Sequence, residues 1–263
     1  MSAPLRSAPP LARVVRGSGP GLLLAHGAGG SIQANFGPVL DGLAEVHTVV
    51  GPDLPGAGHT PRSPESLDLD RLADDLVTAA VEEGLDAFAV AGFSMGTALA
   101  VRATTRHPER VTALTLTAGF ARPNPRFRLA VRLWRELLAA GEIDRLAGYL
   151  SLLAVGAPAL DTLAQSDLDA SLSATAAATS PGTLDHLDLL DRIDVLDELA
   201  GITVPTLVIS TTRDSLVTPY LHRQLADAIP GARYAEIATG HLPFVERPDE
   251  WLALQRGFLD SVR

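Results

Sequence analysis

Short apolar runs alternate with amphipathic stretches through the first half of the chain and again near its end. The runs predict buried strands, at residues 22–25, 46–50, 87–91, 111–117, 205–210 and 232–237. The stretches with helical periodicity are residues 69–83, 95–107, 219–229 and 248–262. Strands that alternate with helices predict an α/β protein, with a mostly parallel central sheet and helices on both of its faces.

The middle of the chain, residues 121–200, has a different pattern, with no convincing strand and several helix-like segments. One helix is indicated by apolar residues at i, i+3, i+4 and i+7 spacing, namely Phe127, Ala130, Val131, Trp134, Leu137 and Leu138. Residues 170–180, rich in Ala, Ser and Thr, predict a loose or weakly helical segment. We therefore divide the chain into a core domain, residues 1–120 and 201–263, and a helical cap, residues 121–200.

A helical insertion between two strands of a parallel sheet is placed to cover the carboxyl ends of the strands, where open α/β sheets bind ligands. The apolar content of the insertion predicts a mostly apolar pocket for a small-molecule substrate. We expect Phe127 and Trp134 to contribute to that pocket.

Composition narrows the class of protein. The 263 residues suffice for one full core with an insertion, and a net charge of −10 disfavours nucleic acid and anionic membranes as partners. Without cysteine the chain has neither a disulfide nor a thiolate metal site. Residues 1–10 lack the apolar core of a signal peptide, and no apolar run is long enough to span a bilayer. A cytoplasmic protein is expected, with its oligomeric state left open.

A nucleophile is indicated by Gly92-Phe93-Ser94-Met95-Gly96, which matches G-x-S-x-G. A serine on a tight strand-to-helix turn occupies a strained backbone region, and side chains two residues before and after it would collide, which explains both glycines. The motif follows an apolar run and precedes a helix-like stretch of small residues. Ser94 is therefore the predicted nucleophile rather than a serine in an ordinary turn.

A serine hydroxyl needs a neighbouring base. Among seven histidines, His241 follows a predicted strand on a loop, whereas His26 sits in a glycine-rich turn that favours a structural role. Asp214 follows another predicted strand and could orient the imidazole, although an aspartate there could also cap the next helix. For the remaining histidines we expect surface positions or local hydrogen bonds.

These motifs resemble those of the α/β-hydrolase superfamily over roughly residues 11–262. His26-Gly27-Ala28-Gly29-Gly30 is similar to the family's oxyanion loop, and Asp53-Leu54-Pro55-Gly56-Ala57-Gly58 to its D-x-x-G-x-G loop. Arg106-His107-Pro108-Glu109-Arg110-Val111, and Gly240-His241 with Glu246-Arg247-Pro248, are further shared features. The resemblance implies a catalytic triad of Ser94, Asp214 and His241, in the chain order of that family, and a cap at residues 121–200.

Ester attack creates an oxyanion that backbone N–H groups stabilise. The family pattern implies that Met95, at a helix N-terminus, supplies one donor. Ala28, together with Gly29, is expected to supply the other. We find no phosphate loop, dinucleotide loop or metal-ligand spacing, so no cofactor or metal is expected.

The leading interpretation is hydrolysis of an ester or lactone through an acyl-enzyme intermediate. A thioesterase or acyltransferase is an alternative, in which Arg128, Arg132 and Arg135 would dock an acyl-carrier protein, although a solvated helix face explains these arginines as well. The resemblance also admits a carbon–carbon bond hydrolase, a lyase, a cyclase or a cofactor-free haloperoxidase, and a non-catalytic small-molecule receptor.

Overall fold

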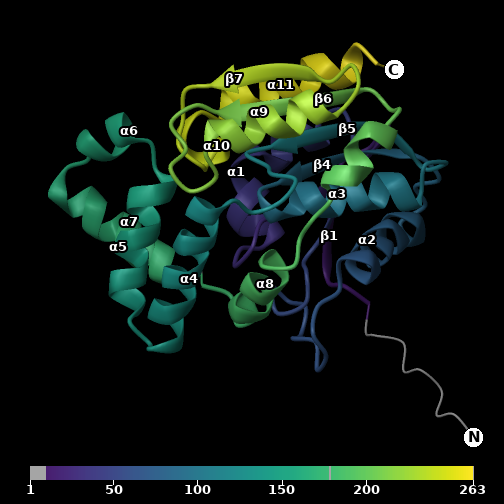
Figure 1. Cartoon of the computed structure of the whole chain (residues 1–263). Coiled ribbons are helices and arrows are strands. Elements are labelled where there is room, and N and C mark those ends of the chain that lie inside the picture. The colour runs from purple at the N-terminus through teal and green to yellow at the C-terminus, as the bar shows by residue number, and fades with distance from the viewer. Residues whose placement is uncertain (1–9, 178, 263) are drawn as a thin grey trace, which may run out of the picture.

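The computed structural model describes residues 10–177 and 179–262; the first nine residues, on which the signal-peptide expectation rests, lie outside this part. Within it a seven-stranded sheet has the order β1-β3-β2-β4-β5-β6-β7 (Figure 1). The strands are β1 (Arg13–Arg16), β2 (Gly21–Ala25), β3 (Thr48–Pro52), β4 (Phe88–Phe93), β5 (Val111–Thr117), β6 (Thr206–Thr211) and β7 (Arg233–Ile237). Only β1, which pairs with β3, is antiparallel. The predicted mostly parallel α/β sheet is confirmed.

Helices cover both faces of the sheet. One face carries α2 (Leu69–Glu82), α3 (Met95–Arg106) and α9 (Pro219–Ala228), and the other carries α1 (Ile32–Ala44), the short α10 (Pro243–Glu246) and α11 (Pro248–Asp260). The strands alternate between the two cores, since Leu23 belongs to the first and its neighbours Leu22 and Leu24 to the second. Both faces are therefore apolar, which is why the strands read as continuous hydrophobic runs.

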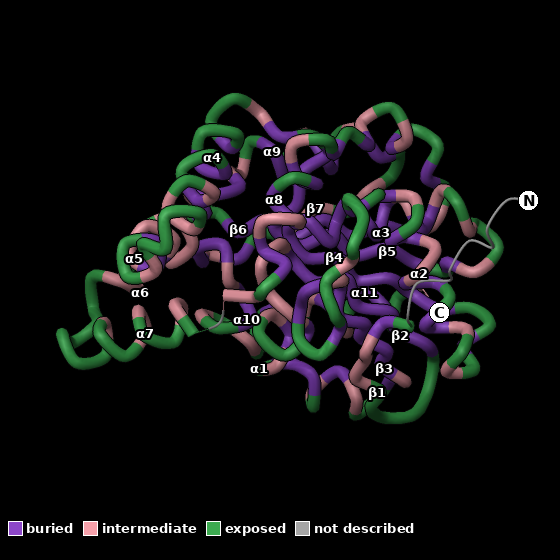
Figure 2. The backbone as a smooth tube through the Cα atoms, turned by 90° about the horizontal axis from the view of Figure 1, so that it is seen from below, coloured by how far each residue is buried: buried purple, intermediate pink, exposed green. Residues whose placement is uncertain are grey.

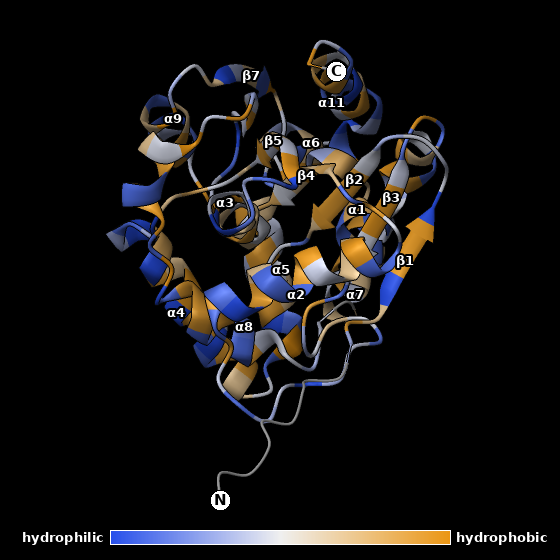
Figure 3. Cartoon of the chain, turned by 90° about the vertical axis from the view of Figure 1, so that its right-hand side faces the viewer, coloured by the Kyte–Doolittle hydropathy of each residue, from blue (hydrophilic) through white to orange (hydrophobic). Residues whose placement is uncertain are grey.

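Burial follows this layered arrangement. Buried residues fill the centre around β4 and β5 in Figure 2, whereas α6 and α7 lie at one exposed end. In Figure 3, β2 and β3 are coloured largely as hydrophobic. The sheet and its covering helices thus form the packed core from which the loops at the carboxyl ends of the strands extend.

The segment between β5 and β6 is helical throughout its regular parts (Figure 1). Its elements are α4 (Pro125–Ala139), α5 (Ile143–Ala154), α6 (Ala157–Asp161), α7 (Gln165–Ala177), α8 (Thr183–Leu190) and the 3-10 helix η1 (Leu196–Gly201). Helix α4 begins where Asn124 accepts a hydrogen bond from the N–H of Phe127 (2.8 Å), with Pro125 as the first helical residue. We call residues 121–200 the helical insertion.

Three elements of the core escaped the sequence patterns, namely β1, α1 and the four-residue helix α10. Strand β1 has four residues with arginine at both ends, so it shows no apolar run. Helix α1 contains Gly37, Pro38 and Gly42, which interrupt a helical pattern. The strand expected at residues 46–50 instead begins at Thr48, because Val46 lies exposed in the preceding turn.

In the described part of the chain, none of the helices has both the length and the apolar character needed to cross a bilayer.

Trp251 is expected to be a major contributor to stability. Its side chain is fully buried, donates to Thr117 Oγ (3.0 Å) and packs with a ring-centroid separation of 4.8 Å on Phe244. Replacing it by alanine opens a large cavity and should lower the free energy of unfolding by about 3–5 kcal/mol. The exposed Tyr220 is a matched aromatic control, whose replacement by alanine should change it by less than about 0.5 kcal/mol. Urea titration checks both, and equal effects would contradict the assignment.

Candidate active site

Ser94 stands on a sharp turn between β4 and α3. Its φ of +53° and ψ of −121° lie in a region that favours glycine and costs a non-glycine residue about 1–3 kcal/mol. A Cβ on Gly92 would overlap the backbone of Gly96, and a Cβ on Gly96 would overlap the carbonyl of Ala25. Both glycines of the motif are therefore required by the close approach of β4, α3 and β2, as the sequence argument expected.

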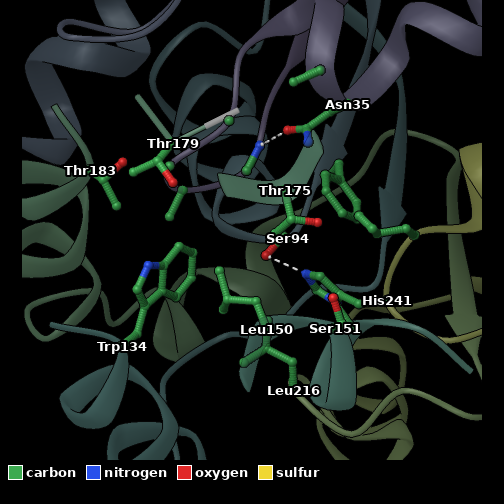
Figure 4. Close-up of a pocket in the computed structure, with 18 of the residues that line it drawn as sticks. Asn35, Ser94, Trp134, Leu150, Ser151, Thr175, Thr179, Thr183, Leu216 and His241 are labelled. Carbon is green, nitrogen blue, oxygen red and sulfur yellow. Dashed lines mark hydrogen bonds between the residues drawn. The ribbon is translucent and has the colours of Figure 1, made fainter. Parts of the chain in front are cut away.

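The structure brings Ser94, His241 and Asp214 into one hydrogen-bonded chain. Figure 4 shows the hydrogen bond between Ser94 and His241. Ser94 Oγ lies 3.0 Å from His241 Nε2, and His241 Nδ1 lies 2.6 Å from Asp214 Oδ2. Asp214 follows β6 and His241 follows β7, so both side chains extend from the carboxyl edge of the sheet. All three residues are buried, with exposed fractions of 7% for Ser94 and 4% for each of the others.

The surroundings of Asp214 fix the hydrogen-bond roles in this chain. Its carboxylate also accepts from Thr211 Oγ (3.0 Å) and from the N–H groups of Leu216 and Val217 (both 2.9 Å). A carboxylate held by donors accepts the Nδ1 proton of His241, which leaves Nε2 free to accept from Ser94 Oγ. The geometry is that required for a general base beside a hydroxyl.

The oxyanion-hole prediction is corrected at one residue. The N–H of Gly29 donates to Nδ1 of His186 (3.1 Å), so it is not free to bind an oxyanion. Among the described residues no hydrogen-bond acceptor faces the N–H of Ala28. Met95 is the first residue of α3, and its N–H therefore has no acceptor within the helix. Ala28 and Met95 remain the candidate donors.

His26 holds the glycine-rich loop, as expected. Its Nε2 accepts from the N–H of Leu54 (2.9 Å), so its Nδ1 carries the proton and donates to the carbonyl of Gly27 (2.8 Å). Complete burial, reinforced by the neighbouring His186, lowers the pKa of His26 to about 3. The imidazole is neutral at physiological pH, and its two hydrogen bonds connect the loop of Gly27 with the loop of Leu54.

His186 ties the helical insertion to the same loops. It lies on α8, accepts from Gly29 and donates from Nε2 to the carbonyl of Pro55 (3.0 Å). Burial lowers its pKa. The sequence assigned His186 only a surface or local role, because no sequence pattern indicates that residues 157 and 131 positions away face it.

His222 lies beside Asp214. Its Nδ1 is 3.0 Å from Ser210 Oγ and its Nε2 is 3.8 Å from Asp214 Oδ2. Burial lowers the pKa of His222 to about 4, outweighing the opposite effect of Asp214. Of the two roles expected for this residue, a surface position or a local hydrogen bond, the structure shows a hydrogen bond in a buried position, because α9 packs this side chain against β6.

A cavity of about 200 Å³ adjoins Ser94 and His241. Phe127 and Trp134 line it, where the sequence placed them. Its walls also include residues that the sequence did not indicate, among them Asn35, Leu150, Ser151, Thr175, Thr179, Thr183 and Leu216 (Figure 4). Among the residues that the structure describes, no aspartate, glutamate or arginine lines the cavity, and the chain has no lysine. The cavity is therefore small, largely apolar and free of fixed charge, with hydroxyl groups along part of its wall.

The arginine stripe on α4 is neutralised by nearby carboxylates. Arg132 pairs with Glu136 (2.8 Å) and Arg135 with Asp191 (2.8 Å), and Arg128 lies 3.9 Å from Asp191. These ion pairs explain the stripe without an acidic partner.

Comparisons with known proteins identify the family. Residues 20–248 match the family model described as the alpha/beta hydrolase fold. The chain is 32% identical to pyrrolizixenacetamide deacetylase of Xenorhabdus hominickii, over 94% of this chain and 93% of the relative. It is 29% identical to a pimeloyl-acyl-carrier-protein methyl ester esterase of Neisseria meningitidis serogroup C, over 91% and 93%. A thermophilic esterase from Thermogutta terrifontis, solved with malate, superposes with a TM-score of 0.83 at 25% identity, over 96% and 93%. The chain belongs to the α/β-hydrolase family and is an enzyme of that class.

We expect the free energy of unfolding to decrease as the pH is lowered, because the buried histidines resist protonation in the folded state. Folding lowers the pKa of His26 to about 3 and that of His222 to about 4, from an ordinary value of 6.5. The unfolded chain therefore binds more protons below pH 6.5, and each imidazole should remove up to about 1.4 kcal/mol of stability per pH unit. Urea titrations between pH 7 and pH 5 measure this slope. Replacing His222 by Gln should make the slope shallower, and an unchanged slope would contradict the assignment.

Proposed function

We propose that the protein is a serine hydrolase that cleaves an ester or lactone bond of a small, uncharged, mostly apolar substrate. The observation that carries the proposal is the chain of hydrogen bonds, 2.6 Å and 3.0 Å long, from Asp214 through His241 to Ser94 at the edge of the cavity. A hydroxyl next to an oriented imidazole is the arrangement that activates a serine nucleophile.

In the proposed mechanism, Ser94 Oγ attacks the carbonyl carbon while its proton passes to His241 Nε2. Asp214 stabilises the resulting imidazolium, and the N–H groups of Ala28 and Met95 bind the oxyanion. His241 then gives the proton to the alkoxide oxygen as its bond to the acyl carbon breaks, so that an alcohol leaves and the acyl group remains on Ser94 as the acyl-enzyme. In the second half, His241 takes a proton from water as the water oxygen attacks the acyl-enzyme carbonyl carbon. His241 then returns this proton to Ser94 Oγ as the bond from Oγ to the acyl carbon breaks, which releases the acid and restores the free serine.

The relatives support acyl-group chemistry in general, since one is named a deacetylase and another a methyl ester esterase. They do not determine whether the substrate of this enzyme releases an amine, as an amide does, or an alcohol, as an ester does. The neutral cavity favours the uncharged-substrate part of the proposal, since placing an unpaired charge among apolar walls is strongly unfavourable.

We further propose that residues 121–200 act as the cap of a core formed by residues 1–120 and 201–263. Phe127 and Trp134 would contact the substrate from α4, and Thr175 and Thr179 from the α7 side. A cavity of about 200 Å³ admits a short acyl chain or a compact lactone, and the cap would set that limit.

Replacing Ser94 by alanine should abolish turnover, because no other group would attack the carbonyl. Short and medium p-nitrophenyl esters measure the rate, and a fluorophosphonate probe should label the wild type but not the variant. Ser173→Ala, an exposed serine on α7, is the matched control and should keep both activities. Labelling without ester turnover would favour cyclase or lyase chemistry, and binding of a small molecule without either would favour a receptor.

A negative charge on the acyl chain of the substrate should lower kcat/KM. We expect kcat/KM for the p-nitrophenyl monoester of succinic acid to be at least about tenfold below that for the butyrate ester, because its carboxylate loses hydration in a cavity without a cationic partner. Each rate is compared with spontaneous hydrolysis of the same ester. A preference for the charged ester would contradict the neutral-substrate proposal.

A further inference from the structure

The carboxyl end of α5 lies against the loop that carries Asp214 and the loop that carries His241. The carbonyl of Ala154 accepts from the N–H of His241 (2.6 Å), and the carbonyl of Leu153 accepts from the N–H of Ser215 (3.2 Å). The last carbonyls of a helix have no partner within it. Here the N–H groups of Ser215, next to Asp214, and of His241 supply the donors. The helical insertion therefore binds both loops through main-chain hydrogen bonds.

Glu246 closes this contact from the core side. One of its carboxylate oxygens, Oε1, accepts from the N–H of Gly240 (2.9 Å) and from the N–H of Gly156 (3.0 Å). Gly240 immediately precedes His241, and Gly156 lies just beyond the end of α5. A single oxygen atom therefore bridges the loop of the base and the insertion.

The two segments bridged by Glu246 touch without intervening side chains. A Cβ on Gly240 would overlap the carbonyl of Ala154 and the N–H of Gly156. A Cβ on Gly156 would lie 2.8 Å from the other oxygen of Glu246. Glycine at both positions lets the main chains meet, and the carboxylate satisfies the two N–H groups that this approach would otherwise leave without an acceptor.

We propose that Glu246 is a positioning residue, which holds the His241 loop against the end of α5 and so couples the seating of the insertion to the placement of the base. This proposal rests on the proposed function of His241. Glu246 acts through the backbone, since it contacts Gly240 rather than the imidazole. A base displaced by about 1 Å can lose on the order of 100-fold in rate, so a positioning contact of this kind has a measurable effect.

Three substitutions separate geometry from charge. Glu246→Ala removes the bridge, and Glu246→Asp keeps the charge on a side chain too short to reach both amides. Both should lower kcat by about 10- to 100-fold with a smaller change in KM. Glu246→Gln keeps a carbonyl oxygen at the same reach and should stay within about threefold of wild type. Glu250→Ala is the matched control, because Glu250 is an exposed carboxylate in the first turn of α11 that pairs with exposed Arg247 (2.9 Å), the residue between α10 and α11.

Proton NMR gives a readout that does not depend on turnover. The Nδ1 proton of His241, in a 2.6 Å hydrogen bond to Asp214, should resonate at low field. We expect this signal in the wild type, Glu246→Gln and Glu250→Ala, and its broadening or loss in Glu246→Ala and Glu246→Asp. Near-ultraviolet circular dichroism establishes that each variant is folded.

The proposal is overturned if folded Glu246→Ala keeps both the wild-type kcat and the low-field signal, even when its melting temperature is lower. That outcome would assign Glu246 a purely structural role. A wild-type protein without turnover or fluorophosphonate labelling would instead refute the proposed function, and the NMR comparison would still test whether Glu246 positions His241.

Discussion

The parallel register of β4, β5, β6 and β7 is the constraint on which the site depends. Phe93 pairs with Thr117, Thr117 with Ile209, and Thr211 with Ile237, so these strands end at one common edge. Ser94, Asp214 and His241 each follow one of them and meet there, although up to 147 positions separate them in the chain. A slip of one residue in any strand would turn its side chains to the opposite face and separate the three groups.

The strained conformation of Ser94 persists because its neighbours enforce it. The turn is fixed at both ends by regular structure, and the absence of side chains at Gly92 and Gly96 lets β2, β4 and α3 come close together. Packing of the sheet against α3 offsets the local strain. The result is a hydroxyl presented at the edge of the sheet within hydrogen-bond distance of His241, which suits a candidate nucleophile.

The helical insertion is joined to both sides of the candidate site. On one side His186 of α8 binds the backbone of Gly29 and Pro55, and thereby sets which amide of the glycine-rich loop stays free. On the other side the end of α5 contacts the loops of Asp214 and His241. The insertion therefore does more than line the cavity, because movement of α5 or α8 would disturb its contacts with the loops that carry the candidate catalytic and oxyanion-hole residues.

The sequence by itself determined the α/β architecture, most of the core elements, the elbow at Ser94 and the candidates His241 and Asp214. These features depend on local periodicity, turn chemistry and strand ends, which neighbouring residues encode; the catalytic roles of the three residues remain predictions. Only the tertiary structure decided that the N–H of Gly29 donates to His186 and that His222 packs beside Asp214. It also decided that Glu246 accepts from the N–H groups of both Gly156 and Gly240. The contacts of Gly29 with His186 and of Gly156 with Glu246 join segments that lie 157 and 90 positions apart, and no local pattern encodes which distant groups a packed fold brings together. His222 lies only eight positions from Asp214, but the packing of α9 on β6 decides that the two side chains meet.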